Sequence, residues 1–299
     1  MADKSSDSAN RPRGGPDPDT TTPEFELPIG ACDCHVHVFG PASRFPFPPE
    51  NAARGFDAPK EDLHAMHGVI GADRCVIVHG GTHGIDLSVT LDALATSPRP
   101  MRAVALVDED VTNARLQELH EAGFRGIRYS PGMTGVPLDP TPVRRMADRL
   151  AVLGWHILFL FKGDMILAYE DLLKELPVPF VLDHCGGIDP TAGGVGQEPV
   201  RAMERLLTGS RGWAKLSGLD RISNQPYPFE DSTRIARNLV MAAPDRVIWG
   251  TDWPHPGIGP PGPTNDGALV DLIPSFTEDP VLQRKLLVDN PSRLYWADE

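Results

Sequence analysis

The sequence predicts a single (β/α)8 TIM-type barrel, and two observations support this fold class. Eight short apolar runs recur along the chain, and stretches with helical periodicity, such as 87–94 and 114–120, lie between them. A doubly wound open sheet is the alternative, but it needs no eighth strand and usually carries a Gly-rich turn after the first strand. This chain has only Gly40 there. The eight expected strands are 31–38, 74–79, 102–107, 126–130, 156–161, 179–184, 212–217 and 246–251.

Composition and charge narrow the class of protein. The chain has 299 residues, of which 40% are apolar and 23% are charged, as in ordinary soluble globular domains. The net charge of −13 argues against a nucleic-acid partner. No apolar run is long enough for a membrane span, and the first residues lack the apolar stretch of a signal peptide. We therefore expect a cytoplasmic protein without a membrane partner, whose oligomeric state the sequence does not determine.

Domain organisation follows from where the hydrophobic residues begin. Residues 1–24 are rich in Pro, Gly, Ser and Asp, so we expect a disordered N-terminal tail. Residues 25–299 then form one barrel domain. The Gly- and Pro-rich loop 256–263 is expected to be a stiff lid segment. The four cysteines lie in or beside apolar runs, where buried, reduced thiols are expected: Cys32, Cys34, Cys75 and Cys185.

Two motifs at strand ends carry most of the functional information. Asp33-Cys34-His35-Val36-His37 belongs to the first strand, and Gly250-Thr251-Asp252-Trp253-Pro254-His255 follows the last. Residues two apart on a strand share a face, so the imidazoles of His35 and His37 should point the same way. Barrel active sites occupy the C-terminal ends of the strands. A His-x-His pair with His184 and Asp252 at other strand ends therefore indicates a metal site or an electrophilic group.

Further polar residues follow the remaining strands. Because the whole chain is acidic, an anionic ligand would need a local cluster of Arg or Lys. We assign substrate binding to three such residues and to two histidines that lie at or after strand ends. The set comprises His83, Arg128, Lys162, Arg221 and His255. Other polar residues have structural interpretations. His156 begins its strand, at the end of the barrel opposite the expected active site, and should be structural. His64, His67 and His120 fall in helical stretches and should be solvated, and Asp183 should fix loops.

The runs DCHVHVFGPASRFPF, GFRGIRY, VPFVLDHCGG and DRVIWGTDWPHP resemble the amidohydrolase superfamily. They are most similar to the 2-pyrone-4,6-dicarboxylate hydrolases and the related 4-sulfomuconolactone hydrolases, lactonases of bacterial aromatic degradation. The resemblance runs from about residue 29 to Trp296. It implies a barrel in which Asp252 activates water. It further implies that His35, His37 and His184 polarise the lactone carbonyl and that Arg128 and Arg221 hold substrate carboxylates.

The chain departs from the dicarboxylate hydrolases where they hold substrate. A Ser after the second strand becomes Gly81, and an Arg past the fourth strand has no counterpart in 130–134. A Tyr after the first strand falls near Arg54-Gly55, a strand-five Tyr becomes Leu160, and a nearby acid becomes Lys162. A lysine is a compact point charge that suits a tetrahedral sulfonate. We therefore expect hydrolysis of an anionic lactone, with 4-sulfomuconolactone as the first choice and a 2-pyrone-4,6-dicarboxylate-like lactone as the second.

Metal content and reaction type leave alternatives open. The fourth and fifth strands end in Arg128-Tyr129-Ser130 and Leu160-Phe161-Lys162, which lack the carboxylate or imidazole of a binuclear centre. One Zn²⁺ held by His35, His37, Asp252 and His184 is expected, and catalysis without a metal is the alternative. A metal-dependent decarboxylase of the same superfamily is the second function, although such enzymes use a strand-five histidine. A silent barrel that only binds anions is the third.

Overall fold

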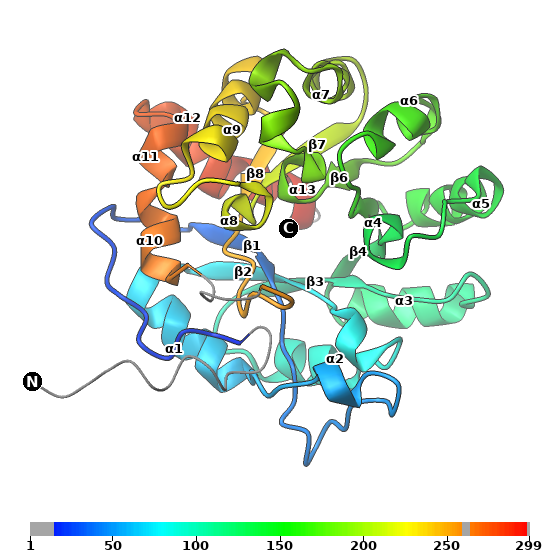
Figure 1. The fold of residues 1–299 in the computed structure, drawn as a ribbon. Helices are drawn as coiled ribbons and strands as arrows, with labels where there is room; N and C mark the ends of the chain where they lie inside the picture. Colours follow the sequence, from blue (N-terminus) through cyan, green and yellow to red (C-terminus); the bar gives the residue numbers. More distant parts are fainter. Residues whose placement is uncertain (1–14, 259–263, 298–299) are drawn as a thin grey trace, which may run out of the picture.

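The computed structural model describes residues 15–258 and 264–297, and eight parallel strands form the ring at its centre (Figure 1). Each strand pairs with the next in sequence order, so the predicted barrel and its eight strands are confirmed. The strands are β1 (Cys32–Val36), β2 (Arg74–Val78), β3 (Met101–Ala105), β4 (Phe124–Tyr129), β5 (His156–Phe159), β6 (Phe180–Leu182), β7 (Gly212–Leu216) and β8 (Val247–Trp249).

The ring closes where the chain leaves β8 and passes along β1. The backbone N–H of Asp252 donates to the carbonyl of His35 at 2.8 Å, and the N–H of His37 donates to the carbonyl of Trp253 at 2.7 Å. A parallel bridge between Val36 and Trp253 continues this pairing. Residues 252 and 253 thus pair with β1 beyond the end of β8 and close the ring. This pairing places Asp252 directly beside the two histidines of the first strand.

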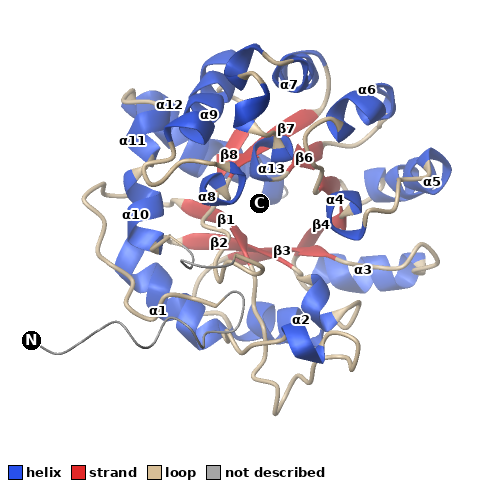
Figure 2. Ribbon diagram, in the orientation of Figure 1, coloured by secondary structure: helices blue, strands red, loops and turns tan. Residues whose placement is uncertain are grey.

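Helices surround the ring and cover the outer faces of the strands (Figure 2). Their buried positions follow helical spacing, as Val143, Met146 and Leu150 do on α5. The helices are α1 (Lys60–Ile70), α2 (Ser88–Thr96), α3 (Asn113–Glu121), α4 (Pro131–Thr134), α5 (Pro140–Ala151), α6 (Met165–Glu175), α7 (Glu198–Gly209), α8 (Leu219–Ile222), α9 (Glu230–Ala242), α10 (Asp266–Asp271), α11 (Ile273–Phe276), α12 (Pro280–Arg284) and α13 (Asn290–Tyr295).

A second apolar cluster fills the inside of the ring. It includes Cys34, Val104, Val181 and Ile248 from four strands, and Tyr295 of α13. The ring of His156, the first residue of β5, lies 5.1 Å from that of Tyr295. α13 therefore closes the N-terminal end of the barrel, where His156 was expected to be structural. All four cysteines are buried and free, as expected.

The N-terminal region is described only from residue 15. Residues 1–14 of the expected disordered tail lie outside the described residues. Residues 15–24 instead lie against α10, because the hydroxyl and N–H of Thr21 donate to Asn265 Oδ1 at 2.8 and 2.9 Å. Asn265 Nδ2 in turn donates to Asp17 Oδ2 at 3.1 Å. Most of the 256–263 loop, residues 259–263, also lies outside the described residues.

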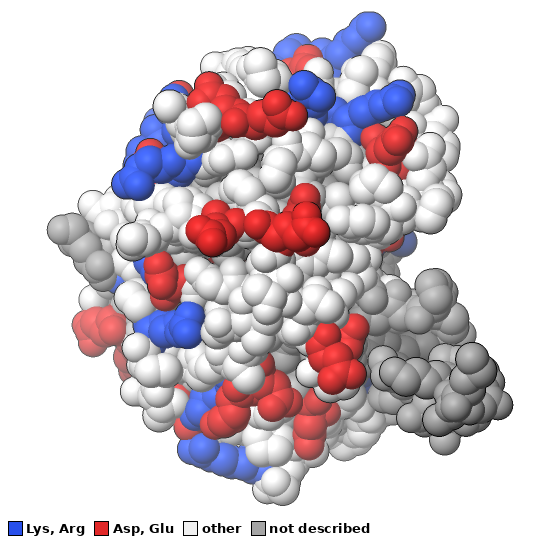
Figure 3. All heavy atoms as spheres, turned by 90° about the vertical axis from the view of Figure 1, so that its left-hand side faces the viewer, with Lys and Arg blue, Asp and Glu red and all other residues white. Residues whose placement is uncertain are grey.

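The described surface fits the charge and hydropathy of the chain. On the face in Figure 3, Lys and Arg side chains lie in separate small groups among acidic ones. Such a face does not resemble the continuous basic surface that binds a nucleic acid. Among the described helices, none combines the length and the apolar character that crossing a bilayer requires.

Candidate active site

β1 turns His35 into the barrel through an irregularity in its pairing. The register of β1 against β2 shifts between Asp33 and Val36. Asp33 Oδ2 therefore contacts His67 Nε2 of the outer helix α1 at 3.2 Å, whereas His35 contacts Asp183 at the end of β6 at 3.2 Å. The expectation that His67 is solvated was wrong: its side chain is 1% exposed because it partners a buried carboxylate.

Asp252 and His184 adopt backbone conformations that non-glycine residues rarely occupy. Their φ values are +68° and +50°, in the left-handed region. Nearby glycines allow close packing around the site: a Cβ on Gly250 would lie 2.6 Å from the His35 amide nitrogen, and one on Gly218 would lie 2.7 Å from His184 Nδ1. Strained residues cluster at functional sites. These turns aim two side chains at one point.

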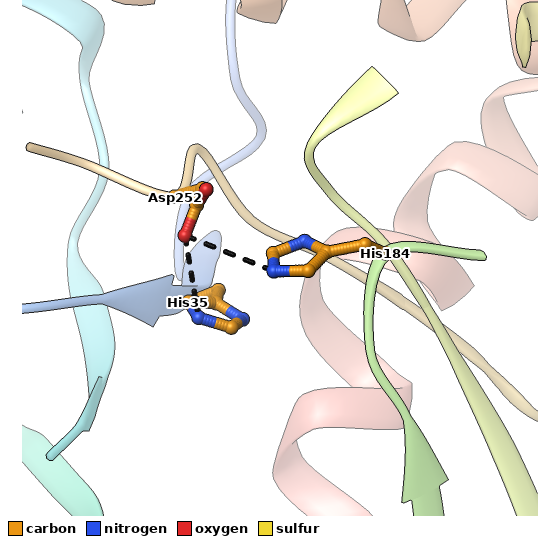
Figure 4. Close-up of side chains that lie close together, drawn as sticks. All are labelled: His35, His184 and Asp252. Carbon is orange, nitrogen blue, oxygen red and sulfur yellow. Dashed lines mark ion pairs between the residues drawn. The ribbon is translucent and has the colours of Figure 1, made fainter. Parts of the chain in front are cut away.

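Three imidazoles surround one oxygen of Asp252, and Figure 4 shows two of them, those of His35 and His184. Asp252 Oδ1 lies 3.4 Å from His35 Nε2, 3.3 Å from His37 Nε2 and 4.0 Å from His184 Nε2. All four residues are at most 4% exposed. The structure thus brings together the four residues that the sequence predicted to be catalytic.

The surroundings of these imidazoles bear on their protonation. His37 Nδ1 lies 2.6 Å from the carbonyl oxygen of Val78, which can only accept, so Nδ1 carries a proton. Burial lowers the pKa of His35 well below its usual range and that of His184 to about 4, so both rings are neutral. A neutral imidazole has one nitrogen with a lone pair, which can bind a metal ion.

This donor set fits a metal ion. His35 Nε2 is buried and makes no hydrogen bond to any described residue. Donor atoms of His35, His184 and Asp252 lie within 4.8 Å of one another. Two imidazoles, a carboxylate and an open position suit Zn²⁺. His37 lies outside this group, although its Nε2 is 3.3 Å from Asp252 Oδ1, and the ligand set expected from the sequence stays a prediction.

Arg221 pairs with the other oxygen of Asp252. It lies on α8, and its Nε donates to Asp252 Oδ2 at 3.0 Å while Nη2 makes a second, short bond to the same oxygen. Burial would raise the pKa of Asp252, but Arg221 and the nearby histidines hold it well below its usual range. The carboxylate is therefore ionised and can accept a proton. A residue predicted to bind substrate thus also holds the predicted base.

A buried ion pair lies beneath the histidines, and sequence reasoning missed it. Lys215 Nζ lies 3.0 Å from Asp183 Oδ1 and 3.3 Å from His35 Nδ1, and the Lys215 and Asp183 side chains are both 0% exposed. Burial would raise the pKa of Asp183, but Lys215 and His35 hold it well below its usual range. Asp183 therefore orients His35 and does not merely fix a loop. The signal in the sequence was a lysine inside the apolar run of β7.

We expect Lys215→Met to destabilise the protein by about 3–5 kcal/mol, because it leaves the buried carboxylate of Asp183 without its principal partner. Urea unfolding measures the loss. Lys174→Met is the control, since Lys174 pairs with Glu170 on the surface of α6 and its loss should cost less than about 1 kcal/mol. Asp183→Asn in the Lys215→Met background should recover part of the loss. Equal, small losses for both lysines would contradict the role of the buried pair.

The other predicted binding residues occupy different settings. Arg128 lies within the site, 8% exposed, with Nη2 3.7 Å from Asp183 Oδ2. His83 and His255 are buried and contact the protein: His83 Nε2 accepts from the Gly40 N–H at 3.1 Å, and His255 Nε2 lies 3.1 Å from Asp266 Oδ1. Lys162 follows β5 with an exposed side chain. Substrate contacts of His83, His255 and Lys162 remain predictions.

Comparison with known proteins agrees with this geometry. The amidohydrolase family model matches residues 32–296. A 2-pyrone-4,6-dicarboxylate hydrolase of Comamonas testosteroni is 39% identical over 286 residues, covering 93% of each chain. A 4-sulfomuconolactone hydrolase of Rhizobium radiobacter is 37% identical, covering 95% of this chain and 96% of that protein.

Solved structures show the same architecture. The crystal structure of a candidate 2-pyrone-4,6-dicarboxylic acid hydrolase from Pseudomonas putida is 27% identical and superposes with a TM-score of 0.76, covering 91% of this chain and 100% of that one. The resemblance inferred from the strand-end motifs is thus confirmed at the level of sequence and fold. The chain belongs to the amidohydrolase family.

Proposed function

We propose that the protein hydrolyses an anionic lactone by adding water to the ring ester. The observation that carries this proposal is the convergence of three imidazoles and an ionised carboxylate at one point, with Arg128 and Arg221 beside it. Ester hydrolysis needs these elements: a base for water, electrophilic groups for the carbonyl and cations for an anionic substrate. Curated relatives that act on lactones support the same reaction class.

In the proposed reaction, Asp252 accepts a proton from water as the water oxygen attacks the lactone carbonyl carbon. The ring C–O bond then breaks, and Asp252 returns the proton to the departing ring oxygen, which yields the open-chain acid. His37 keeps its Nε2 facing the site because Val78 holds its Nδ1 proton. Lys215 and Asp183 hold His35 in place from below.

We propose that His35, His184 and Asp252 hold one Zn²⁺, with His37 beside it. A bound Zn²⁺ would act as a Lewis acid for the carbonyl oxygen. Polarisation of the carbonyl directly by the three histidines is the alternative. The experiments in the Discussion separate the two.

The decarboxylase alternative has less support. It would use a histidine at the C-terminal end of β5, but the one histidine of that strand, His156, opens it and contacts Tyr295 at the other end of the barrel. The two reactions have different products, because a decarboxylase releases CO₂ whereas a lactonase takes up water and releases acid. Lactones with one and with two anionic groups, assayed by loss of ultraviolet absorbance and by acid release, test the proposal. CO₂ release without lactone opening would reject it.

Arg221→Met should lower kcat/KM by roughly 10- to 150-fold, mainly through KM, because a hydrogen bond to a charged group contributes about 1.5–3 kcal/mol. Arg221→Lys should recover only part of this, since lysine lacks the planar fork of the guanidinium. Steady-state kinetics on the best lactone provide the measurement. Arg205→Met, which removes a surface arginine paired with Glu170, is the matched control. A KM unchanged in Arg221→Met would show that Arg221 serves Asp252 alone.

A further inference from the structure

A cavity of about 350 Å³ opens next to the histidine cluster, between the ends of β2, β3 and β4 and the segment that contains α4. Arg128 connects the two: it lines the cavity, lies 3.7 Å from Asp183, and interacts electrostatically with Asp252. Arg128 therefore borders both the cavity and the group of residues around Asp252. Its volume lies in the range of small-molecule binding sites.

The described lining of this cavity contains one cationic side chain and two acidic ones. Among the described residues that line it, Arg128 is the only Lys or Arg, whereas two lining residues, Glu109 and Asp139, are acidic. The Nε of Arg128 is buried and has no hydrogen-bond partner among the described residues. A buried guanidinium donor without a partner favours an anionic group of a ligand. A second anionic group in the same cavity would meet two carboxylates and no further cation.

The walls of the cavity are apolar. Met133 and Val136 lie at its outer rim with exposures of 66% and 65%. Other apolar lining residues are Leu106, Val107, Leu138 and Val143. This surface can bury an uncharged group but offers little to a hydrated anion.

The outer wall is held in place by the end of β5. The N–H of Gly132 donates to the Leu160 carbonyl at 3.0 Å, and a Cβ on Gly132 would lie 2.8 Å from that same oxygen. α4 thus lies against the neighbouring strand as closely as a glycine allows. A wall fixed in this way can discriminate between substituents by shape.

We propose that this cavity selects lactones that carry one carboxylate and an uncharged, apolar ring substituent, with the carboxylate against Arg128 and the substituent against the Met133–Val136 rim. The inference rests on the proposed lactone hydrolysis and specifies its substrate class. It differs from the sulfonated lactone expected from the sequence, because a sulfonate in this cavity would lie between apolar walls and two carboxylates.

The test uses enol lactones that share one carboxymethyl group and differ at one ring carbon, which carries hydrogen, methyl, ethyl, carboxylate or sulfonate. We expect kcat/KM to rise about fourfold for each carbon added. The carboxylate and sulfonate compounds should fall at least about tenfold below the methyl compound. A wild-type preference for either dianionic lactone would overturn the inference and leave lactone hydrolysis intact. If the enzyme opens none of the lactones, both the proposed function and this inference are rejected.

Substitutions at Met133 and Val136 provide a second test of the inference. Val136→Arg and, independently, Met133→Arg should lower kcat/KM for the methyl lactone and raise it for the carboxylate lactone, so that the ratio changes at least about tenfold. Both positions are exposed, so the fold should tolerate the change. Val152→Arg is the matched control, since Val152 is 87% exposed at the end of α5 and does not line the cavity. A ratio unchanged in both rim variants would also overturn the inference.

Discussion

Asp252→Asn should reduce turnover of the lactone by about 10²–10⁴-fold, because asparagine keeps the size of the side chain but cannot accept the proton of water. The structure strengthens this expectation, since Arg221 and the histidines keep Asp252 ionised although it is buried. KM should change little. Single-turnover measurements with the best lactone of the panel would isolate the chemical step from product release.

The control for Asp252→Asn is Asp189→Asn, the same change at an exposed position that caps a short turn. It should retain full activity. Circular dichroism and thermal unfolding would show that Asp252→Asn folds, which matters because Arg221 loses its partner in this variant. An Asp252→Asn protein that keeps more than half of the wild-type rate would exclude Asp252 as the base.

Protein purified without added metal should contain about one Zn²⁺ per chain, and exhaustive chelation should abolish turnover. His35→Ala and His184→Ala each remove a donor of the group around Asp252, so they should lose most of the zinc together with activity. His37→Ala should lose activity but retain more zinc, because His37 lies outside that group. Elemental analysis reads the metal content independently of catalysis.

His64→Ala is the matched control for these variants, since His64 lies on α1 and makes no hydrogen bond to a described residue. It should keep both zinc and activity. Fully active protein with negligible metal after chelation would instead support direct polarisation of the carbonyl by the three histidines. In that case His35→Ala, His37→Ala and His184→Ala should all reduce turnover without a change in metal content.

The barrel and the principal site residues could be predicted because both depend on local patterns. Apolar runs alternating with helix-period segments predict strands and helices whatever their partners, and parallel strands place their C-terminal residues at one mouth. His35, His37, His184 and Asp252 each stand at or just beyond the end of such a run. The topology therefore places all four residues at the same mouth of the barrel.

Residues whose role depends on a distant partner could not be assigned in this way. His67 has the sequence context of a surface helix residue, yet it is buried against Asp33. Asp183 was expected to fix loops, but it lies between Lys215, His35 and Arg128. Each of these contacts joins different strands or helices, and no periodicity within one element encodes it.

The sequence by itself determined the number and order of strands, the mouth at which the site lies and the residues that reach it, because alternation and strand ends are properties of short segments. Only the tertiary structure decided which nitrogens face Asp252, which side chains bring donor atoms within 4.8 Å of one another, and which residues form the cavity beside Arg128. The physical reason is that the register of β1 shifts against β2 and that Asp252 and His184 adopt left-handed backbone conformations. Those departures from regular geometry set side-chain directions that regular periodicity does not predict.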